Sequence, residues 1–124
     1  MGLFKRLGER LSAPPEQLRA QEIRKWCDDI GDVEQIGVCR ARQRARVAGI
    51  VQTIKVVPRD SSTSLEVQIY DGTDEVVGIW FGRRRIAGIE LGRGLILKGT
   101  LGRYGRGPLT IINPEYELLP AESE

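Results

Sequence analysis

The spacing of hydrophobic residues changes once along the chain, close to residue 44. Before that point, apolar residues in two segments recur every three or four positions, as they do on one face of a helix. After it, apolar and polar residues alternate, which is the pattern of β-strands. The pattern therefore predicts a short helical part followed by a larger β part.

Two amphipathic helices are predicted in the first part. Leu3, Phe4, Leu7 and Leu11 form the apolar stripe of a helix over residues 2–11. Ala20, Ile23, Cys27 and Ile30, with Trp26 beside them, form that of a second helix ending near Gly31. The first stripe suits either packing on the protein's own domain or contact with a protein partner or membrane surface.

Five strands are predicted from Arg44 onward. The first is long and bent, with a β-bulge near Gly49 where the apolar phase changes. The others span residues 65–70, 76–81, 95–101 and 109–112, and Asp71-Gly72 turns the second into the third. Residues 58–63, 82–94 and 102–108 are predicted loops, the second with room for one helical turn over residues 84–88.

These elements predict an all-β core with an N-terminal α-helical extension. A bent first strand, a hairpin and an insertion before the fourth strand outline a five-stranded Greek-key barrel of the OB-fold type. A small sandwich or an SH3-like barrel is the alternative. The expected organisation is a helical extension over residues 1–39, an OB-fold domain over residues 40–119 and an acidic, disordered tail over residues 120–124.

Composition argues against catalysis. Among 124 residues there is no histidine and there are two cysteines, which excludes histidine-assisted nucleophiles and the usual zinc sites. We therefore expect a non-enzyme without catalytic residues, cofactor or metal. The acidic residues Asp71, Asp74 and Glu75 are interpreted as turn residues.

No apolar run is long enough to span a membrane, and a cytoplasmic location is expected.

Arginine dominates the positive charge. The net charge is only +2, but 15 of the 19 basic residues are arginine, and most lie between residues 40 and 117. A guanidinium group suits phosphate oxygens and base stacking better than an ammonium group does. A polyanionic partner is one explanation of this composition, and an ordinary solvated surface is the other.

The second and third predicted strands supply a candidate stacking surface. Their outward side is predicted to present Gln68, Tyr70, Gly78 and Trp80. Exposed aromatic rings on an open sheet bind single-stranded nucleic acid by stacking on bases. Alternatively, Trp80 lies beneath the N-terminal helices, against Trp26 and Phe4.

Basic residues in the predicted loops supply candidate phosphate contacts. The run Arg83-Arg84-Arg85, with Arg93 nearby, follows the third strand, and the loop over residues 102–108 contains Arg103, Tyr104 and Arg106. Arg59 lies in the opposing loop. Solvated charge and an ordinary hairpin loop are the competing interpretations.

A further arginine series precedes the first strand. Arg40, Arg42, Arg44 and Arg46 alternate along it, either as a basic ridge or as partners of the acidic residues at positions 28–34.

Several segments together resemble a known family. The runs Arg46-Val47-Ala48-Gly49 and Tyr70-Asp71-Gly72-Thr73, residues 80–93, and Asn113-Pro114-Glu115-Tyr116-Glu117-Leu118 resemble small stand-alone OB-fold nucleic-acid-binding proteins of actinobacteria. The layout over residues 44–119 is also similar to the wedge domain of RecG-type branched-DNA helicases. The resemblance implies nucleic-acid binding without catalysis, and the wedge domain suggests junction DNA.

The sequence thus predicts a protein that binds single-stranded or branched DNA, with DNA favoured over RNA. The expected binding residues are Arg46, Arg59, Gln68, Tyr70, Trp80, Arg83, Arg84, Arg85, Arg93, Arg103, Tyr104 and Arg106. The alternative is an interaction adaptor that binds a protein partner through the barrel and the helix bearing Leu3, Phe4 and Leu7.

Overall fold

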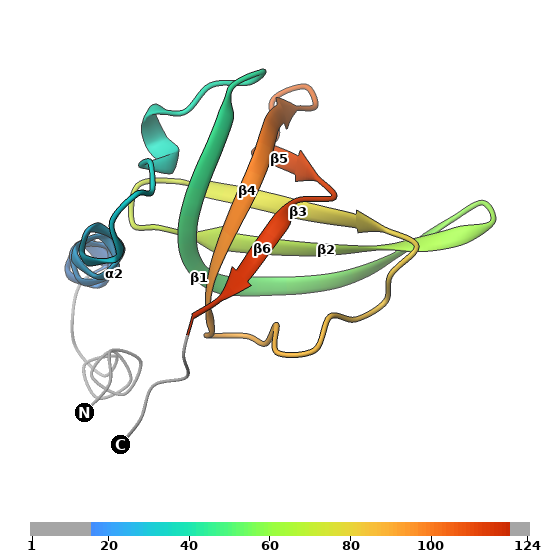
Figure 1. The fold of residues 1–124 in the computed structure, drawn as a ribbon, viewed down its shortest axis with the longest axis horizontal. Helices are drawn as coiled ribbons and strands as arrows, with labels where there is room; N and C mark the ends of the chain where they lie inside the picture. The colour runs from blue at the N-terminus through green and yellow to red at the C-terminus, as the bar shows by residue number, and fades with distance from the viewer. Residues whose placement is uncertain (1–15, 120–124) are drawn as a thin grey trace.

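A closed ring of five strands forms the centre of the protein (Figure 1). The computed structural model describes residues 16–119. Around the ring the order is β1 (Arg44–Arg59), β2 (Ser62–Tyr70), β3 (Glu75–Phe81), β5 (Leu109–Ile112) and β4 (Gly94–Arg103), and β4 pairs with β1 to close it. Only β3 and β5 run parallel to each other. The predicted OB barrel is confirmed, and the alternative of a small sandwich is excluded because the ring closes.

Strand β1 belongs to two parts of the barrel because it bends. Its first half pairs with β4, and the part from Ile50 onward pairs with β2. The register shift lies between Val51 and Thr53, so the predicted bulge near Gly49 was misplaced. Gly49 lies instead where β1 passes from its pairing with β4 to its pairing with β2, and a Cβ there would be 2.7 Å from the Tyr70 carbonyl oxygen.

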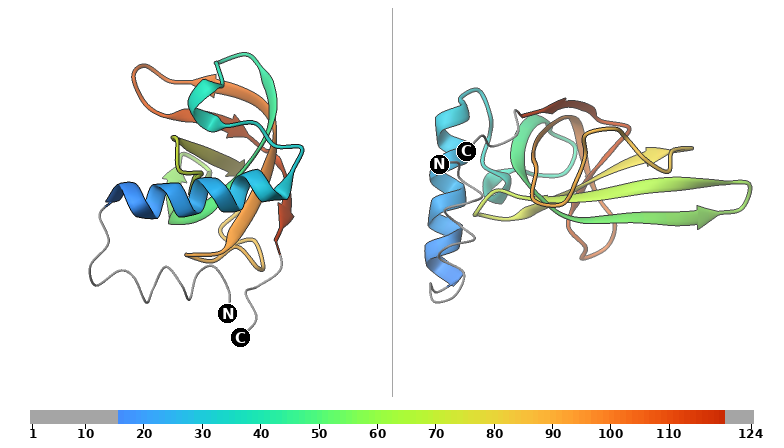
Figure 2. Two further views of the ribbon diagram at one scale, coloured as in Figure 1. Left: turned by 90° about the vertical axis from the view of Figure 1, so that its left-hand side faces the viewer. Right: turned by 90° about the horizontal axis from the view of Figure 1, so that it is seen from below.

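The β1–β2 hairpin is longer than the sequence pattern predicted. Pro58 pairs with Thr63 and Arg59 with Ser62, so most of the predicted loop over residues 58–63 is strand. Val56 and Val57 lead into this extension and Thr63 lies within it, and β-branched side chains suit a pleated surface. The hairpin projects beyond the barrel, away from the helix at the other end (Figures 1 and 2).

The chain continues in strand conformation after β5. It breaks at Asn113-Pro114, as predicted, because proline cannot donate a ladder hydrogen bond. It then forms β6 (Glu115–Leu118), which pairs with the first half of β4 and was not predicted. Strands β5 and β6 thus follow the same edge of β4, with the Asn113-Pro114 break between them.

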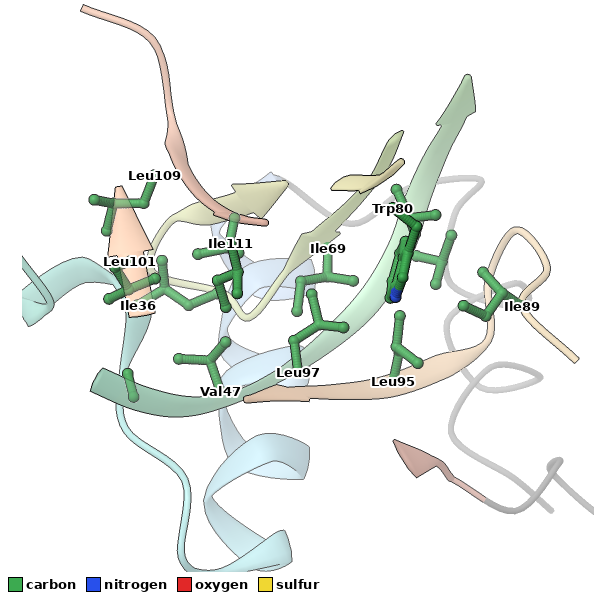
Figure 3. Close-up of a cluster of buried hydrophobic side chains, with 14 of the residues drawn as sticks. Ile36, Val47, Ile69, Trp80, Ile89, Leu95, Leu97, Leu101, Leu109 and Ile111 are labelled. Atoms are coloured by element: carbon green, nitrogen blue, oxygen red, sulfur yellow. The ribbon is translucent and has the colours of Figure 1, made fainter. Parts of the chain in front are cut away.

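The barrel interior is filled by aliphatic side chains from every strand of the ring (Figure 3). The buried cluster includes Val47, Leu65, Val67, Ile69, Val76, Trp80, Leu95, Leu97, Leu101, Leu109 and Ile111. The segment between β3 and β4 adds Ile86 and Ile89. No helix forms in that segment, so the predicted helical turn over residues 84–88 was wrong. The aliphatic cluster and these two residues make up one continuous core.

Trp80 lies inside the barrel, contrary to the prediction that it faces solvent. Its side chain is 6% exposed, and its indole N–H donates to the Pro114 carbonyl at 3.2 Å. The ring of Tyr116 meets it edge-on, with 5.9 Å between ring centroids. The alternative interpretation, that Trp80 packs beneath the helices against Trp26, is also wrong, because its ring belongs to the barrel core.

Helix α2 (Glu16–Ile30) covers one end of the barrel and confirms the second predicted helix. Ile23 and Cys27 pack on Ile50 of β1, with Trp26 and Tyr70 beside them. Burial raises the pKa of the Cys27 thiol to about 12, so it remains a neutral apolar group. The predicted helix over residues 2–11 and the acidic tail over residues 120–124 lie outside the described residues.

A buried carboxylate joins the helix to the barrel. Asp71 is 1% exposed and accepts hydrogen bonds from Arg24 of α2 at 2.7 Å and from the backbone N–H of Ile36 at 2.8 Å. Ile36 begins the short 3-10 helix η1 (Ile36–Val38). The other oxygen of Asp71 accepts from Thr73 and Asp74 in its own turn. Because every buried charge needs such partners, this residue fixes α2, η1 and the β2–β3 turn together.

We predict that Gly78→Ala destabilises the barrel. A Cβ at this position would lie 3.1 Å from Leu97 and 3.2 Å from the Trp80 ring. Overpacking of this kind lowers the free energy of unfolding by about 1–3 kcal/mol, which urea denaturation measures. The control is Gly102→Ala in β4, whose Cβ would meet only Thr110 at 3.4 Å. An equal loss in both variants would contradict the proposed role of Gly78.

Candidate nucleic-acid interface

The outer face of β2 and β3 is hollowed between the β1–β2 hairpin and the β4–β5 loop. One hollow of about 460 Å³ is lined by Arg59, Glu66, Val77, Ile79, Phe81, Tyr104, Gly107, Pro108, Thr110 and Ile112. A second, of about 540 Å³, is lined by Lys55, Glu66, Gln68, Asp74, Glu75, Val77, Arg103, Arg106, Gly107 and Pro108. Because the two share Glu66, Val77, Gly107 and Pro108, we treat them as one depression and name it the β2–β3 groove.

Helix α2 leaves this groove open. The helix packs on Ile50 and Tyr70 at one end of the barrel, whereas the hairpin that borders the groove projects from the other end (Figure 2). None of the residues that line the groove belongs to α2 or η1. Within residues 16–119, the protein's own helical segment therefore does not cover the candidate surface.

Two exposed aromatic rings lie at the groove. Phe81, at the end of β3, is 47% exposed, and Tyr104, in the β4–β5 loop, is 65% exposed. The backbone N–H of Phe81 donates to the Asn113 side chain at 3.1 Å, and that of Gly82 donates to the Thr63 carbonyl at 2.7 Å. These bonds fix the end of β3. Tyr104 was predicted as a binding residue. Phe81 was not, because the sequence analysis placed Trp80 and not Phe81 on the outer side of β3.

The side of the sheet on which each side chain lies determines which other predicted strand residues reach the groove. In β2, Gln68 faces outward as predicted and accepts from the Thr53 hydroxyl at 3.2 Å. Tyr70, two residues later, is half-buried against the residues under α2. Trp80 is in the core. The predicted pair of rings, Tyr70 and Trp80, is therefore not the aromatic surface of this face.

Three predicted arginines line the groove. Arg59 donates from Nε to the Ser64 hydroxyl at 3.0 Å, and its guanidinium lies over the Phe81 ring, 5.4 Å from the centroid. Arg103 donates to the Gly107 carbonyl at 2.9 Å, within the loop that also carries Arg106. A cation over an aromatic face is stabilised by the ring's electrons. The groove thus combines held guanidinium groups with apolar surface.

The run Arg83 to Arg85 begins two residues after Phe81. All three side chains are exposed, and the Arg83 carbonyl accepts from the Thr63 hydroxyl at 3.5 Å. This contact holds the start of the run near the tip of the β1–β2 hairpin, where Thr63 pairs with Pro58. The run therefore extends positive charge from the Phe81 end of the groove.

Arg46 and Arg93 lie elsewhere and make internal contacts. Arg46 donates to the carbonyls of Gly31 and Asp32 and lies 3.5 Å from Glu117 of β6. Arg93 donates to the carbonyls of Gly88 and Leu119. The structure does not bring either residue to the groove, because both join chain segments around the outside of the barrel.

The acidic residues do not form a metal centre. The carboxylate of Asp71 is fully used in hydrogen bonds, and Asp74 accepts from the Glu75 backbone. Over residues 16–119 no group of three or more histidine, cysteine, aspartate or glutamate side chains could hold a metal ion. Asp71 and Asp74 accept hydrogen bonds within this turn, as their interpretation as turn residues implied, and Asp71 also binds α2 and η1.

A family model agrees with this architecture. The family model described as OB-fold nucleic acid binding domain matches residues 45–119. No curated protein matches the sequence significantly. A solved structure of RecG bound to a three-way DNA junction is similar over 73% of this chain, with a TM-score of 0.49 and 16% identity. The match covers 14% of that chain, so this protein spans a small part of its length.

Within residues 16–119, no helix is long and apolar enough to cross a membrane.

Two classes of observation now agree on the family, namely the strand topology and the family match. The strand order, the closure of β1 on β4 and the family match all describe the same barrel. The chain belongs to the family of OB-fold nucleic acid binding domains.

Proposed function

We propose that this protein binds single-stranded or branched DNA in the β2–β3 groove and catalyses no reaction. The observation that supports this proposal is the placement of two exposed rings, Phe81 and Tyr104, at an open groove bordered by arginines. Rings of this kind stack on bases with little dependence on sequence. The family to which the chain belongs typically serves as a binding module.

Each side-chain type has a role in the proposed complex. The flat apolar floor of Val77 and Ile79 and the ring of Phe81 contact base faces, and Tyr104 closes the opposite side. Arg103 and Arg106 hold phosphates at the loop, and the run Arg83 to Arg85 holds them beyond Phe81. Glycines of the β4–β5 loop let the backbone approach the strand, since Gly105 has φ +61°.

The alternative hypothesis is a protein-interaction adaptor. Its main residues, Leu3, Phe4 and Leu7, lie outside the described residues. The observation that favours the nucleic-acid proposal is the open groove with its two exposed rings. Comparing DNA, RNA and forked DNA oligonucleotides in the assays below separates the ligand classes.

We predict that removing either exposed ring weakens binding. Phe81→Ala and Tyr104→Ala each lose one stacked base, worth about 1–3 kcal/mol, so Kd for a single-stranded oligonucleotide rises about 5- to 150-fold in fluorescence anisotropy. The matched control is Trp80→Phe, which alters a buried ring. It lowers stability and leaves Kd within about twofold of the wild-type value. Loss of affinity in Trp80→Phe alone would overturn the assignment of the rings.

We predict that the loop arginines set the salt dependence. Replacing Arg103 and Arg106 by serine removes two phosphate contacts, so the slope of log Kobs against log salt becomes shallower by about 1.4 for a single strand. Lys25→Ser on α2 removes an exposed positive charge away from the groove and should leave the slope unchanged. If the arginine variant keeps the wild-type slope, the loop does not contact phosphates.

A further inference from the structure

A carboxylate lies where a polyanion is expected to bind. Glu66, in the middle of β2, lines both hollows of the β2–β3 groove, and its side chain is 26% exposed. It pairs in register with Ile79, so it borders the apolar floor on the same face. A half-buried negative charge disfavours phosphate nearby. Its position is therefore better suited to a group that donates hydrogen bonds, such as a base edge.

Arg59 places donors directly beside this acceptor. Its Nε is held by Ser64, and its Nη2 lies 3.7 Å from Oε2 of Glu66, which is longer than a hydrogen bond. The guanidinium also lies over the Phe81 ring, 5.4 Å from its centroid, which gives it a second contact beside the Ser64 hydrogen bond. Arg59 and Glu66 thus form an ion pair, and within the part of the chain that the structure describes no hydrogen bond occupies Nη1 of Arg59 or Oε1 of Glu66.

The side-by-side arrangement matches one base better than the others. The exposed edge of an unpaired guanine presents the acceptor O6 followed by two adjacent donors, N1–H and N2–H, and a carboxylate can accept both donors at once. Thymine offers one donor. Adenine and cytosine present a ring nitrogen acceptor next to their amino group, which a carboxylate repels.

We propose that Arg59 and Glu66 make the β2–β3 groove select guanine within a single strand. This inference rests on the proposed function. The base lies against Val77 and Ile79 beside the Phe81 ring, its N1–H and N2–H donate to Glu66, and Arg59 donates to O6. Glu66 is then a specificity-determining residue, while the rings and loop arginines supply affinity that does not depend on sequence.

The test compares oligothymidines that carry one central guanine, inosine, adenine, cytosine or thymine. Inosine keeps O6 and N1–H and lacks the N2 amino group, so it isolates one hydrogen bond without altering the protein. Guanine is expected to bind about tenfold more tightly than thymine, a difference typical of a base contact made by two hydrogen bonds. The affinity for inosine is expected to lie between the two.

Variants then assign the preference to the carboxylate. Glu66→Gln brings a donor towards the base and should reduce the difference between guanine and thymine to about twofold or less. The control Glu117→Gln, on β6 outside the groove, keeps the wild-type preference. Thermal unfolding of each variant confirms that it is folded.

The outcomes separate the two proposals. If the wild-type protein binds every oligonucleotide equally, guanine selection is overturned and the proposed function stands. If Glu66→Gln retains the guanine preference, the assignment of that preference to Glu66 is overturned, and the proposed function again stands. If no oligonucleotide binds, the proposed function fails and the selection fails with it. Equal binding of guanine and inosine overturns the contact between the N2 amino group and Glu66.

Discussion

The direction in which the Trp80 ring points determines which face of β3 is available for binding. The ring fits inside because Gly78 has no side chain and because the Pro114 carbonyl satisfies the indole N–H. With Trp80 inward, Phe81 must point outward, since neighbouring strand residues face opposite sides. The core and the candidate interface are therefore two consequences of one packing constraint on a single strand.

The arginines divide into two groups with different physical roles. Arg24 and Arg46 neutralise or bridge internal groups: the first pairs with buried Asp71, and the second holds carbonyls before β1. These contacts fasten α2 and its connection to one end of the barrel, away from the hairpin (Figure 1). Arg103 and the exposed run after Phe81 have no such internal ion pairs within residues 16–119. The fold thus leaves cationic groups available at the groove.

The barrel was predictable from alternation and turn residues, but the facing of β3 was not assigned correctly. Over the predicted strand, residues 76–81, both alternating sets are apolar apart from Gly78, so hydrophobicity alone did not distinguish them. The number of residues that join β2 to β3 contained the information that hydrophobicity did not supply. When an even number of residues joins β2 to β3, Leu65 pairs with one of the alternating residues Val76, Gly78 and Trp80. The connection from Tyr70 to Glu75 has an even number of residues, and Leu65 pairs with Trp80. Because Leu65 faces inward, Trp80 faces inward too. Arg46 and Arg93 could not be placed, because their carbonyl partners depend on the tertiary path of distant segments.

The most direct test of the central claim is an NMR titration of the labelled protein with a single-stranded DNA oligonucleotide, followed through the backbone amide signals. The groove account predicts that the largest shifts lie in β2, in β3 up to Phe81 and in the loop around Tyr104, while the amides of α2 remain unchanged. Shifts concentrated on α2 or on β6, with the groove amides unaffected, would contradict it.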